Sequence, residues 1–422
     1  MINSQKKYVI SGLGVLSAIG QDNPSFWNAL LSATSGVSEV TKIDKSLFTT
    51  KIAAQLDMEP VLECLGREAR NCSTNTQMSL ACAKQIFESM EYPEFLKKNP
   101  VIGVILGSGL GGLYMSQQVM DKLHDRTINK IHPLTVPFVD ANSIVSSVSK
   151  RWCLYGPQYT VSTACSSSAH AIGLALDTLR TGRCDAVLTG GVECTVNPLT
   201  FAGFDRIGAM SKENDRPEAA CKPFSHDRSG FVMGEGAAMM IIEEESVALS
   251  RGAPIYAEIC GYGSSGGGFH TVKPVDEGAD SVIAMENALN DAGISAEQID
   301  LINPHGTGTQ LNDLAESQAL LKVFGNRLSE IPITPTKQLT GHLLGASGAI
   351  EVAQLLNCLY EQTISPIKYY EPMDGFNLKI PIVSPKRAHI KYALKNSFGF
   401  GNNNVCLIFK RYEHEQYESK NQ

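Results

Sequence analysis

The sequence lacks any apolar run of about 18 residues, the length that a membrane-spanning helix requires. Its opening residues, MINSQKKYVISG, lack the long apolar segment of a secretory signal. Basic residues are not in excess either, because 36 lysines and arginines stand against 43 aspartates and glutamates, a net charge of −7. Nothing in this balance indicates a nucleic-acid or anionic-membrane surface. We expect a cytoplasmic protein that binds neither.

The sequence also lacks a C-x-x-C pair, although it contains 11 cysteines. Their odd number and wide scatter argue against a zinc site or a disulfide framework and favour reduced thiols. Most of them are expected to be small buried side chains. A cysteine with a chemical function must therefore be recognised by its local context.

There is no low-complexity segment and no long linker, and a hydrophobic content of 43% with 19% charged residues is typical of a globular protein. Short apolar runs alternate with amphipathic segments, which we expect to be helices at 74–90, 168–182, 279–293 and 347–361. This alternation predicts an α/β architecture with layered sheets. We expect an N-terminal half over 1–253, a C-terminal half over 254–412 and a polar tail over 413–422.

The stretch VSTACSSSAHAIG places Cys165 among hydroxyl residues. The segments 159–165 and 184–191 are expected to be buried strands, and a helix is expected to end at Gly182. Cys165 would then lie at a helix N-terminus, where free N–H groups and the helix dipole favour a thiolate. Such a junction suits a nucleophile that offers its own N–H to an oxyanion. The alternative is a buried cysteine beside serines that cap the helix.

Two histidines occupy comparable junctions. His305, in LINPHGTGTQLND, follows an expected strand, and His342, in PTKQLTGHLLGASGAIE, precedes small residues at an expected helix start. Either one alone is more often structural. Taken with Cys165, they suggest hydrogen-bond donors to a thioester carbonyl oxygen on which charge develops.

Two glycine-rich motifs allow more than one interpretation. In NSFGFGNNN, Gly399 and Gly401 would let Phe400 act as a hinged gate and offer its N–H, or the motif is a turn with a core phenylalanine. GSGLGG at 107–112 fits the dinucleotide fingerprint, but no acidic residue ends a second strand about 20 residues later. Packing or pocket lining is the better interpretation.

The segment 222–237 contains the charged residues Asp227, Arg228 and Glu235, which suggest buried ion-pair scaffolding.

Together, TACSSSAHAI, KPFSHDRSGFVMGEGA, NPHGTGTQLND, KQLTGHLLGASG and NSFGFG resemble the β-ketoacyl-acyl-carrier-protein synthases, and the resemblance covers nearly the whole chain. It extends to the type II elongating enzymes and the polyketide ketosynthases. It implies a thiolase-like fold of two similar halves in five αβαβα layers, usually dimeric. It also implies decarboxylative Claisen condensation of a cysteine-bound acyl chain with malonyl-acyl carrier protein. No cofactor would be needed, since substrates arrive on the carrier's phosphopantetheine arm.

The resemblance also implies residue roles. Cys165 would carry the acyl chain, His305 and His342 would support decarboxylation, and the N–H groups of Cys165 and Phe400 would hold the oxyanion. Lys337 would orient His342 and be tied to Glu351. The substrate or its pantetheine arm would contact Thr307, Thr309, Leu110, Phe204 and His270. Asp313 and Glu316 would be structural, and the carrier would dock on Arg67, Arg70 and Lys130.

Some residues depart from the family pattern. Serines follow Cys165 where fatty-acid enzymes more often have Ala-Thr-Gly, and asparagines stand at 402 and 403 where glycine and threonine are usual. These departures favour a polyketide role, as the catalytic subunit of a ketosynthase/chain-length-factor heterodimer. The alternatives are a homodimeric fatty-acid elongation synthase, a non-catalytic partner subunit and an NAD-binding oxidoreductase.

Overall fold

The computed structural model describes residues 6–413 apart from 269, 272 and 382–383. Within these residues, nine strands form one mixed sheet in the order β10-β13-β14-β9-β1-β8-β6-β4-β5. The strands that come from the N-terminal half are β1 (Tyr8–Leu16), β4 (Ile102–Gly107), β5 (Gln158–Val161), β6 (Ala186–Glu193) and β8 (Gly236–Glu244). Those from the C-terminal half are β9 (Ala257–Gly266), β10 (Leu301–Asn303), β13 (Tyr392–Gly399) and β14 (Asn403–Lys410).

The two halves repeat one topology. In the N-terminal half, the spatial order β5-β4-β6-β8-β1 corresponds to chain order 3-2-4-5-1. The C-terminal half has the same order when Ile333, which forms a parallel bridge to Ile302 of β10, is counted as its third strand. In each half the last strand runs antiparallel to its neighbours. The halves join through a short pairing of β1 with β9.

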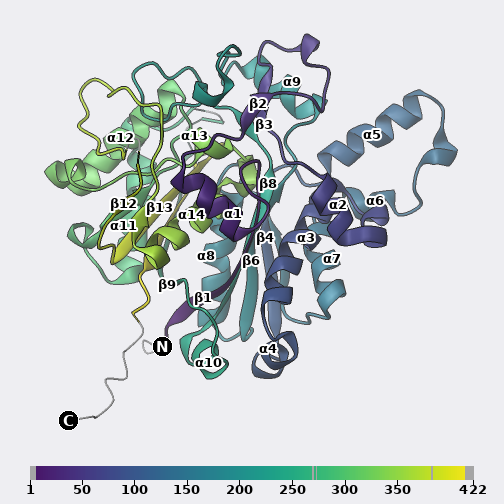
Figure 1. The fold of residues 1–422 in the computed structure, drawn as a ribbon, viewed down its shortest axis with the longest axis horizontal. Helices are drawn as coiled ribbons and strands as arrows, with labels where there is room; N and C mark the ends of the chain where they lie inside the picture. The colour runs from purple at the N-terminus through teal and green to yellow at the C-terminus, as the bar shows by residue number, and fades with distance from the viewer. Residues whose placement is uncertain (1–5, 269, 272, 382–383, 414–422) are drawn as a thin grey trace.

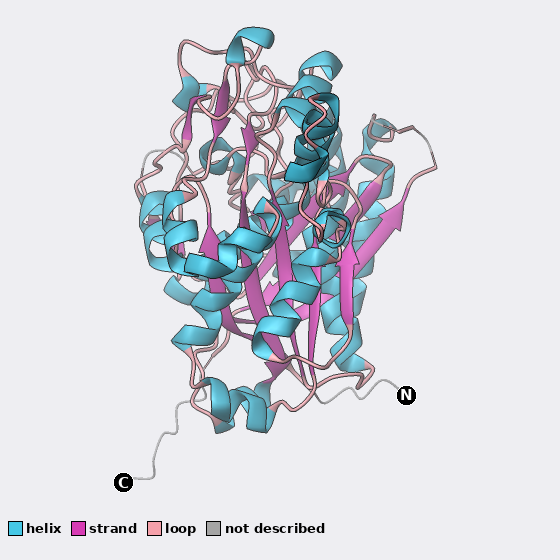
Figure 2. Cartoon of the chain, turned by 90° about the vertical axis from the view of Figure 1, so that its right-hand side faces the viewer, coloured by secondary structure: helices cyan, strands magenta, loops and turns pink. Residues whose placement is uncertain are grey.

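Helices and sheet halves stack in five layers. In the middle lie α8 (Ser167–Arg180) and α14 (Ser347–Glu361), whose buried side chains form one core with both halves of the sheet. The outer face of the N-terminal half is covered by α3 (Thr74–Ser89) and α7 (Ser143–Trp152), and that of the C-terminal half by α11 (Ala279–Ala292) and α12 (Gln310–Phe324). Figures 1 and 2 show this helix–sheet–helix–sheet–helix arrangement, which confirms the expected α/β, thiolase-like fold.

The remaining elements decorate this frame. The further helices are α1 (Asn23–Leu31), α2 (Glu59–Leu65), α4 (Tyr92–Lys98), α5 (Leu113–His124), α6 (Thr135–Val139), α9 (Pro198–Ile207), α10 (Glu245–Ser250) and α13 (Lys337–Thr340). The short strands are β2 (Val37–Glu39), β3 (Ile52–Ala54), β7 (Met233–Gly234), β11 (Thr363–Ile364) and β12 (Lys386–Arg387). In Figure 1, α5 and α6 project away from the body. Across the part of the chain described, no helix combines the length and apolarity needed to span a membrane.

The four expected helices are confirmed as α3, α8, α11 and α14, because their apolar periodicity is matched by burial on the faces that pack. One expected strand differs. The segment 159–165 was expected to be buried, but β5 ends at Val161, lies at the edge of the sheet and has exposed side chains at Gln158 and Tyr159. The division at 253/254 falls between α10 and β9 and remains a prediction. Most of the expected tail, 414–422, lies outside the described residues.

Candidate active site

A cavity of about 430 Å³ opens between the two halves. Residues of both halves line it, and most of the candidates singled out from the sequence are among them: Cys165, Phe204, His270, His305, Thr307, Thr309, Glu316, His342, Gly399 and Phe400. Other candidates do not line it, namely Leu110, Asp313, Lys337, Glu351 and Gly401. The tertiary structure therefore brings the thiol and both histidines, which are far apart in sequence, to one space.

Cys165 lies in the tight turn between β5 and α8. Ala164 before it has a φ of 52°, a left-handed conformation that is uncommon for alanine and turns the chain sharply into the helix. Ser166 occupies the N-cap position of α8, but its side chain makes no capping hydrogen bond, contrary to the alternative interpretation of these serines. Ser166 and Ser167 instead donate hydrogen bonds back to the carbonyl oxygens of Thr163 (2.8 Å) and Ala164 (2.6 Å), which stabilises this turn.

The protonation of Cys165 differs from the expectation. Burial raises the pKa of its thiol to about 12, while the ammonium of Lys337 and the N–H of Phe400 act in the opposite direction. Desolvation of the charged form therefore outweighs the helix N-terminus. The thiol therefore predominates at neutral pH, in place of the thiolate that the helix N-terminus was expected to favour.

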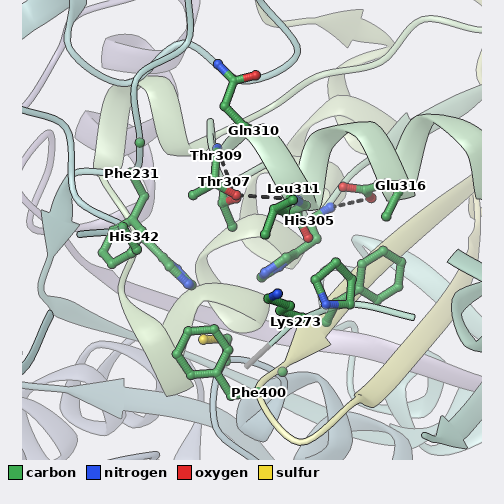
Figure 3. A pocket seen from close by; sticks show the side chains of 18 of the residues that line it. Phe231, Lys273, His305, Thr307, Thr309, Gln310, Leu311, Glu316, His342 and Phe400 are labelled. Atoms are coloured by element: carbon green, nitrogen blue, oxygen red, sulfur yellow. Dashed lines mark hydrogen bonds between the residues drawn. The ribbon is translucent and has the colours of Figure 1, made fainter. Parts of the chain in front are cut away.

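The two histidines face each other across the cavity. Their ring centroids lie 5.5 Å apart with an interplanar angle of 80°, and Figure 3 shows both imidazoles directed into the space above Phe400. Burial lowers the pKa of each ring well below its usual range, and the nearby Lys337 ammonium lowers it further. Both rings are therefore neutral at physiological pH, and a neutral imidazole can donate one hydrogen bond.

Contacts on the far side of each ring set its orientation. Lys337 Nζ lies 3.4 Å from His305 Nδ1 and also donates to the carbonyl oxygen of His305. An ammonium group has no acceptor, so His305 Nδ1 accepts and the ring proton resides on Nε2. His342 Nδ1 lies 2.7 Å from the Ser347 hydroxyl. The expectation that Lys337 orients His342 is therefore wrong, since its direct contact is with His305.

Lys337 is buried behind the cavity and forms an ion pair of 2.5 Å with Glu351 Oε1, as expected. The carboxylate of Glu351 comes from α14, the helix that follows His342. Lys337 does not touch the cavity. It therefore lies behind His305 and is separated from the cavity by that ring.

The loop of Phe400 closes one side of the site. Its N–H faces the Cys165 sulfur, and its ring lies 6.2 Å, centroid to centroid, from Phe204. A Cβ on Gly399 would lie 2.5 Å from the Thr163 carbonyl oxygen, so only glycine fits there. Gly401 has a φ of 77°, which also favours glycine. Gly399 ends β13, so the motif is a strand end followed by a turn.

Two carboxylates hold the loop that follows His305. Glu316 accepts the N–H groups of His305 and Gly306, both at 2.8 Å, and burial raises its pKa to about 7. Asp313 accepts the N–H groups of Thr307 (3.1 Å) and Gly308 (3.2 Å). Both contacts fit the structural roles expected for these residues. The hydroxyls of Thr307 and Thr309, 2.9 Å apart, are thereby held at the cavity wall.

Sequence reasoning missed two buried charged residues. Glu193 ends β6 and accepts the N–H groups of Gly109 (2.6 Å) and Gly345 (3.1 Å); burial raises its pKa to about 7. Lys395 lies on β13, is fully buried and pairs with Glu351 Oε2 at 2.7 Å. The available signal was a charged residue inside an apolar strand, in GGVE and in YALKNSF.

Other candidates have packing or surface positions. A Cβ on Gly107 would lie 2.3 Å from the Ser168 nitrogen, so the first glycine of GSGLGG packs against α8. Leu110 belongs to the apolar cluster around Cys165 without lining the cavity. The buried ion-pair scaffold expected in 222–237 is confirmed for Arg228, which pairs with Asp313, and for Glu235, which pairs with Lys42. Asp227 pairs with Lys222 but is exposed. Arg67, Arg70 and Lys130 are exposed, and none lines the cavity.

Two family models match the sequence in succession. The model described as beta-ketoacyl synthase, N-terminal domain, matches residues 5–248. The model described as beta-ketoacyl synthase, C-terminal domain, matches residues 256–371. The two matches together contain Cys165, His305, Lys337 and His342.

Curated relatives match over essentially the full length. The 3-oxoacyl-[acyl-carrier-protein] synthase 2 of Vibrio cholerae is 36% identical over 414 residues, which is 97% of this chain and 100% of the relative. The protein of the same name from Staphylococcus aureus is 34% identical, over 98% of this chain and 100% of the relative.

Solved structures superpose equally completely. A beta-ketoacyl synthase from Burkholderia phymatum aligns with a TM-score of 0.89 at 28% identity, covering 97% of this chain and 100% of that one. A chain from a type II PKS acyl-carrier protein in complex with its ketosynthase, bound to the hexaketide, aligns with a TM-score of 0.88 at 29% identity and the same coverage. The ishigamide ketosynthase/chain length factor aligns at 0.87 and 27% identity, again over 97% and 100%.

Proposed function

This chain belongs to the β-ketoacyl synthase family, and we propose that Cys165 is the residue on which it holds the acyl chain during condensation. The protein is a β-ketoacyl-acyl-carrier-protein synthase, an acyltransferase of fatty-acid or polyketide biosynthesis. One observation carries the assignment of the site. The Cys165 thiol, the Phe400 N–H and two neutral imidazoles converge on a single cavity that reaches the surface.

In the first step, Cys165 takes the acyl group from the carrier's thioester. The thiol must lose its proton as the sulfur attacks, and the pantetheine thiol must gain one as it leaves. We propose that the N–H groups of Cys165 and Phe400 stabilise the oxyanion that forms on the carbonyl oxygen, and the Phe400 N–H facing the Cys165 sulfur supports this. Thr307 and Thr309 present hydroxyls from the cavity wall toward the pantetheine arm.

In the second step, malonyl-acyl carrier protein loses CO₂ and becomes an enolate. The C–C bond to the carboxylate breaks, and its electron pair passes to the thioester oxygen. His305 and His342 are neutral donors that can stabilise this oxygen through their Nε2–H groups. The enolate carbon then attacks the carbonyl carbon of the Cys165 thioester, the new C–C bond forms, and the sulfur leaves as a thiolate that takes up a proton from water to regenerate the thiol. Decarboxylation supplies the carbanion, so we propose that no cofactor takes part.

We propose a second protomer on the edge of β5. Within the described residues β5 pairs only with β4, and it leaves Tyr159 48% exposed with Tyr155 nearby at 83%. An exposed edge strand with aromatic side chains is suited to pairing with another chain. The second chain would be an identical copy or a homologue of the chain-length-factor type.

We also propose that the acyl carrier protein docks on Arg67, Arg70 and Lys130 of this chain. The free thiols of the cysteines agree with a cytoplasmic location.

The test is a condensation assay with purified protein, malonyl-acyl carrier protein and a set of acyl-carrier proteins. Wild type is expected to give a β-ketoacyl product and a mass increase at Cys165, and Cys165→Ala is expected to give neither. Elongation of saturated C6–C14 chains by the protein alone would assign it to fatty-acid synthesis. A requirement for an added homologous subunit would assign it to a ketosynthase/chain-length-factor pair. Unchanged product from Cys165→Ala would refute the catalytic assignment and favour a non-catalytic subunit.

A further inference from the structure

Glu351 serves two lysines. Its Oε1 accepts Lys337 at 2.5 Å and its Oε2 lies 2.7 Å from Lys395 Nζ, and all three side chains are at most 1% exposed. Lys337 is explained by its contact with His305. No such contact explains the presence of Lys395, because it touches neither the cavity nor a histidine ring. Removing an ammonium group from water is costly unless it is paired and hydrogen-bonded inside the protein. The partners of Lys395 therefore indicate what the residue does.

The contacts of Lys395 converge on the backbone that carries His305. Its Nζ lies 3.4 Å from the carbonyl oxygen of Pro304, the residue immediately before His305, and also donates to the carbonyl oxygen of Asn396. Lys337 holds the carbonyl oxygen of His305 itself. Two ammonium groups, bridged by one carboxylate, thus bind two successive carbonyl oxygens.

Positive charges outnumber negative charges in the cluster of Lys337, Lys395 and Glu351. Two lysines share one carboxylate, and the nearest other carboxylate, Glu316, has a pKa raised to about 7 by burial. The charged or titratable groups that face Lys395 are Glu351 of α14, Lys337 of α13, Glu316 of α12, Cys406 of β14, and the histidines His305 and His342. The cluster is therefore net positive whenever Glu316 is protonated, and an excess positive charge disfavours a further proton on either ring.

We propose that Lys395 is a second positioning residue, which shares Glu351 with Lys337, fixes the 304–305 backbone and keeps His305 and His342 uncharged as the pH falls. The inference rests on the roles proposed above for these histidines. Burial is the main cause of the lowered pKa of His305 and His342, and the ammonium groups of Lys337 and Lys395 lower the pKa of both rings further, which supports the geometry. The consequence is a condensing site whose donors stay neutral below pH 6.5, where an ordinary histidine becomes charged.

The test compares Lys395→Gln, which keeps a donor but loses the charge, with Lys395→Arg, which keeps the charge. Decarboxylation of malonyl-acyl carrier protein is measured from pH 5 to 9. Lys395→Gln is expected to move the acid limb to higher pH than in wild type, with less than about a threefold change in rate at pH 8. Lys395→Arg is expected to keep the wild-type limb. Arg251→Gln, which removes another buried ion-paired cation, is the matched control and should not move the limb.

A second measurement separates this inference from the proposed function. NMR of protein labelled at the histidine rings gives the titration of His305 and His342 without turnover, with His305→Asn and His342→Asn identifying the signals. Both signals should begin to titrate at higher pH in Lys395→Gln than in wild type. If Lys395→Gln does not fold, the nearly isosteric Lys395→Met is used in the same way. An unchanged histidine titration and an unchanged acid limb would overturn the role of Lys395. Full condensation by His305→Ala would instead refute the proposed function.

Discussion

The Nδ1 atom of His342 lies 2.7 Å from the hydroxyl oxygen of Ser347, at the start of α14. When the hydroxyl donates to Nδ1, the ring proton lies on Nε2 and faces the cavity. Ser347 therefore contacts Nδ1 of His342 as Lys337 contacts Nδ1 of His305. A serine near the start of a buried helix thus sets the tautomer of a histidine five residues earlier.

Ser347→Ala should lower the condensation rate about 10- to 100-fold, because the ring is no longer held as a donor toward the substrate oxygen. Acylation of Cys165, measured by intact mass, should continue. Ser317→Ala is the matched control, since Ser317 is also buried on a helix and bonds the carbonyl oxygen of Asp313. Equal losses in both variants would mean that Ser347 acts only through stability.

The reactivity of Cys165 should depend steeply on pH. Burial raises the pKa of its thiol to about 12, so the thiolate fraction should rise about tenfold per pH unit. Iodoacetamide alkylation at Cys165, followed by peptide mass analysis, should increase from pH 6 to 9 without a plateau. A plateau below pH 8 would show a stabilised thiolate. Cys165→Ala should lower condensation by about 10³-fold or more, whereas Cys358→Ala, at a buried cysteine in the core, should not.

Acid should destabilise the fold through His342. Its folded-state pKa is lowered by burial, so the unfolded chain binds more protons below about pH 6.5, and stability falls as the pH drops. The loss is about 1.4 kcal/mol per pH unit until the folded-state pKa is reached. Because the unfolded chain is only half protonated at pH 6.5, the difference in free energy of unfolding between wild type and His342→Asn should shrink by about 1 kcal/mol between pH 6.5 and 5.5. His226→Asn, at an exposed histidine, should show no such change.

The contribution of Glu193 to stability should depend on pH with the opposite sign to that of His342. Burial raises its pKa from 4.5 to about 7, so its contribution to stability is fully present below about pH 4.5 and is lost as the pH rises toward 7. Glu193→Gln removes an acceptor of several buried donors, at a cost of about 1–3 kcal/mol. This cost should be largest near pH 5 and smaller at pH 8, as measured by denaturant unfolding. A cost that grows with pH would show that Glu193 is ionised throughout.

The turn before Phe400 should tolerate no side chain at Gly399. An alanine Cβ would lie 2.5 Å from the Thr163 carbonyl oxygen and would move the strand end that carries the Phe400 N–H. Gly399→Ala is expected to destabilise the protein by about 1–3 kcal/mol and to slow acyl transfer. Gly203→Ala, where no atom lies within 4 Å of the added Cβ, should leave both unchanged. A fully active Gly399→Ala enzyme would contradict the placement of this loop.

Several elements were predictable because their signals are local. Helices α3, α8, α11 and α14 follow from apolar periodicity bounded by turn residues. Cys165, His305 and His342 stood out because each occupies a glycine-rich or small-residue junction, and such junctions bring backbone close to a site. The pairing of Lys337 with Glu351 was also anticipated, and the structure has it.

The sequence by itself determined the fold class and singled out the cysteine and histidines that line the candidate site, since hydrophobic period, turn residues and ordered motifs are properties of neighbouring residues. The tertiary structure alone decided that Lys337 contacts His305 and not His342, that β5 is an edge strand, and that Glu193 and Lys395 are buried at the site. It also decided that Cys165 is a thiol, because burial raises its pKa. These properties depend on contacts between segments distant in the chain and on the removal of water around them. A pattern of neighbouring residues in the sequence predicts neither these long-range contacts nor the removal of water around them.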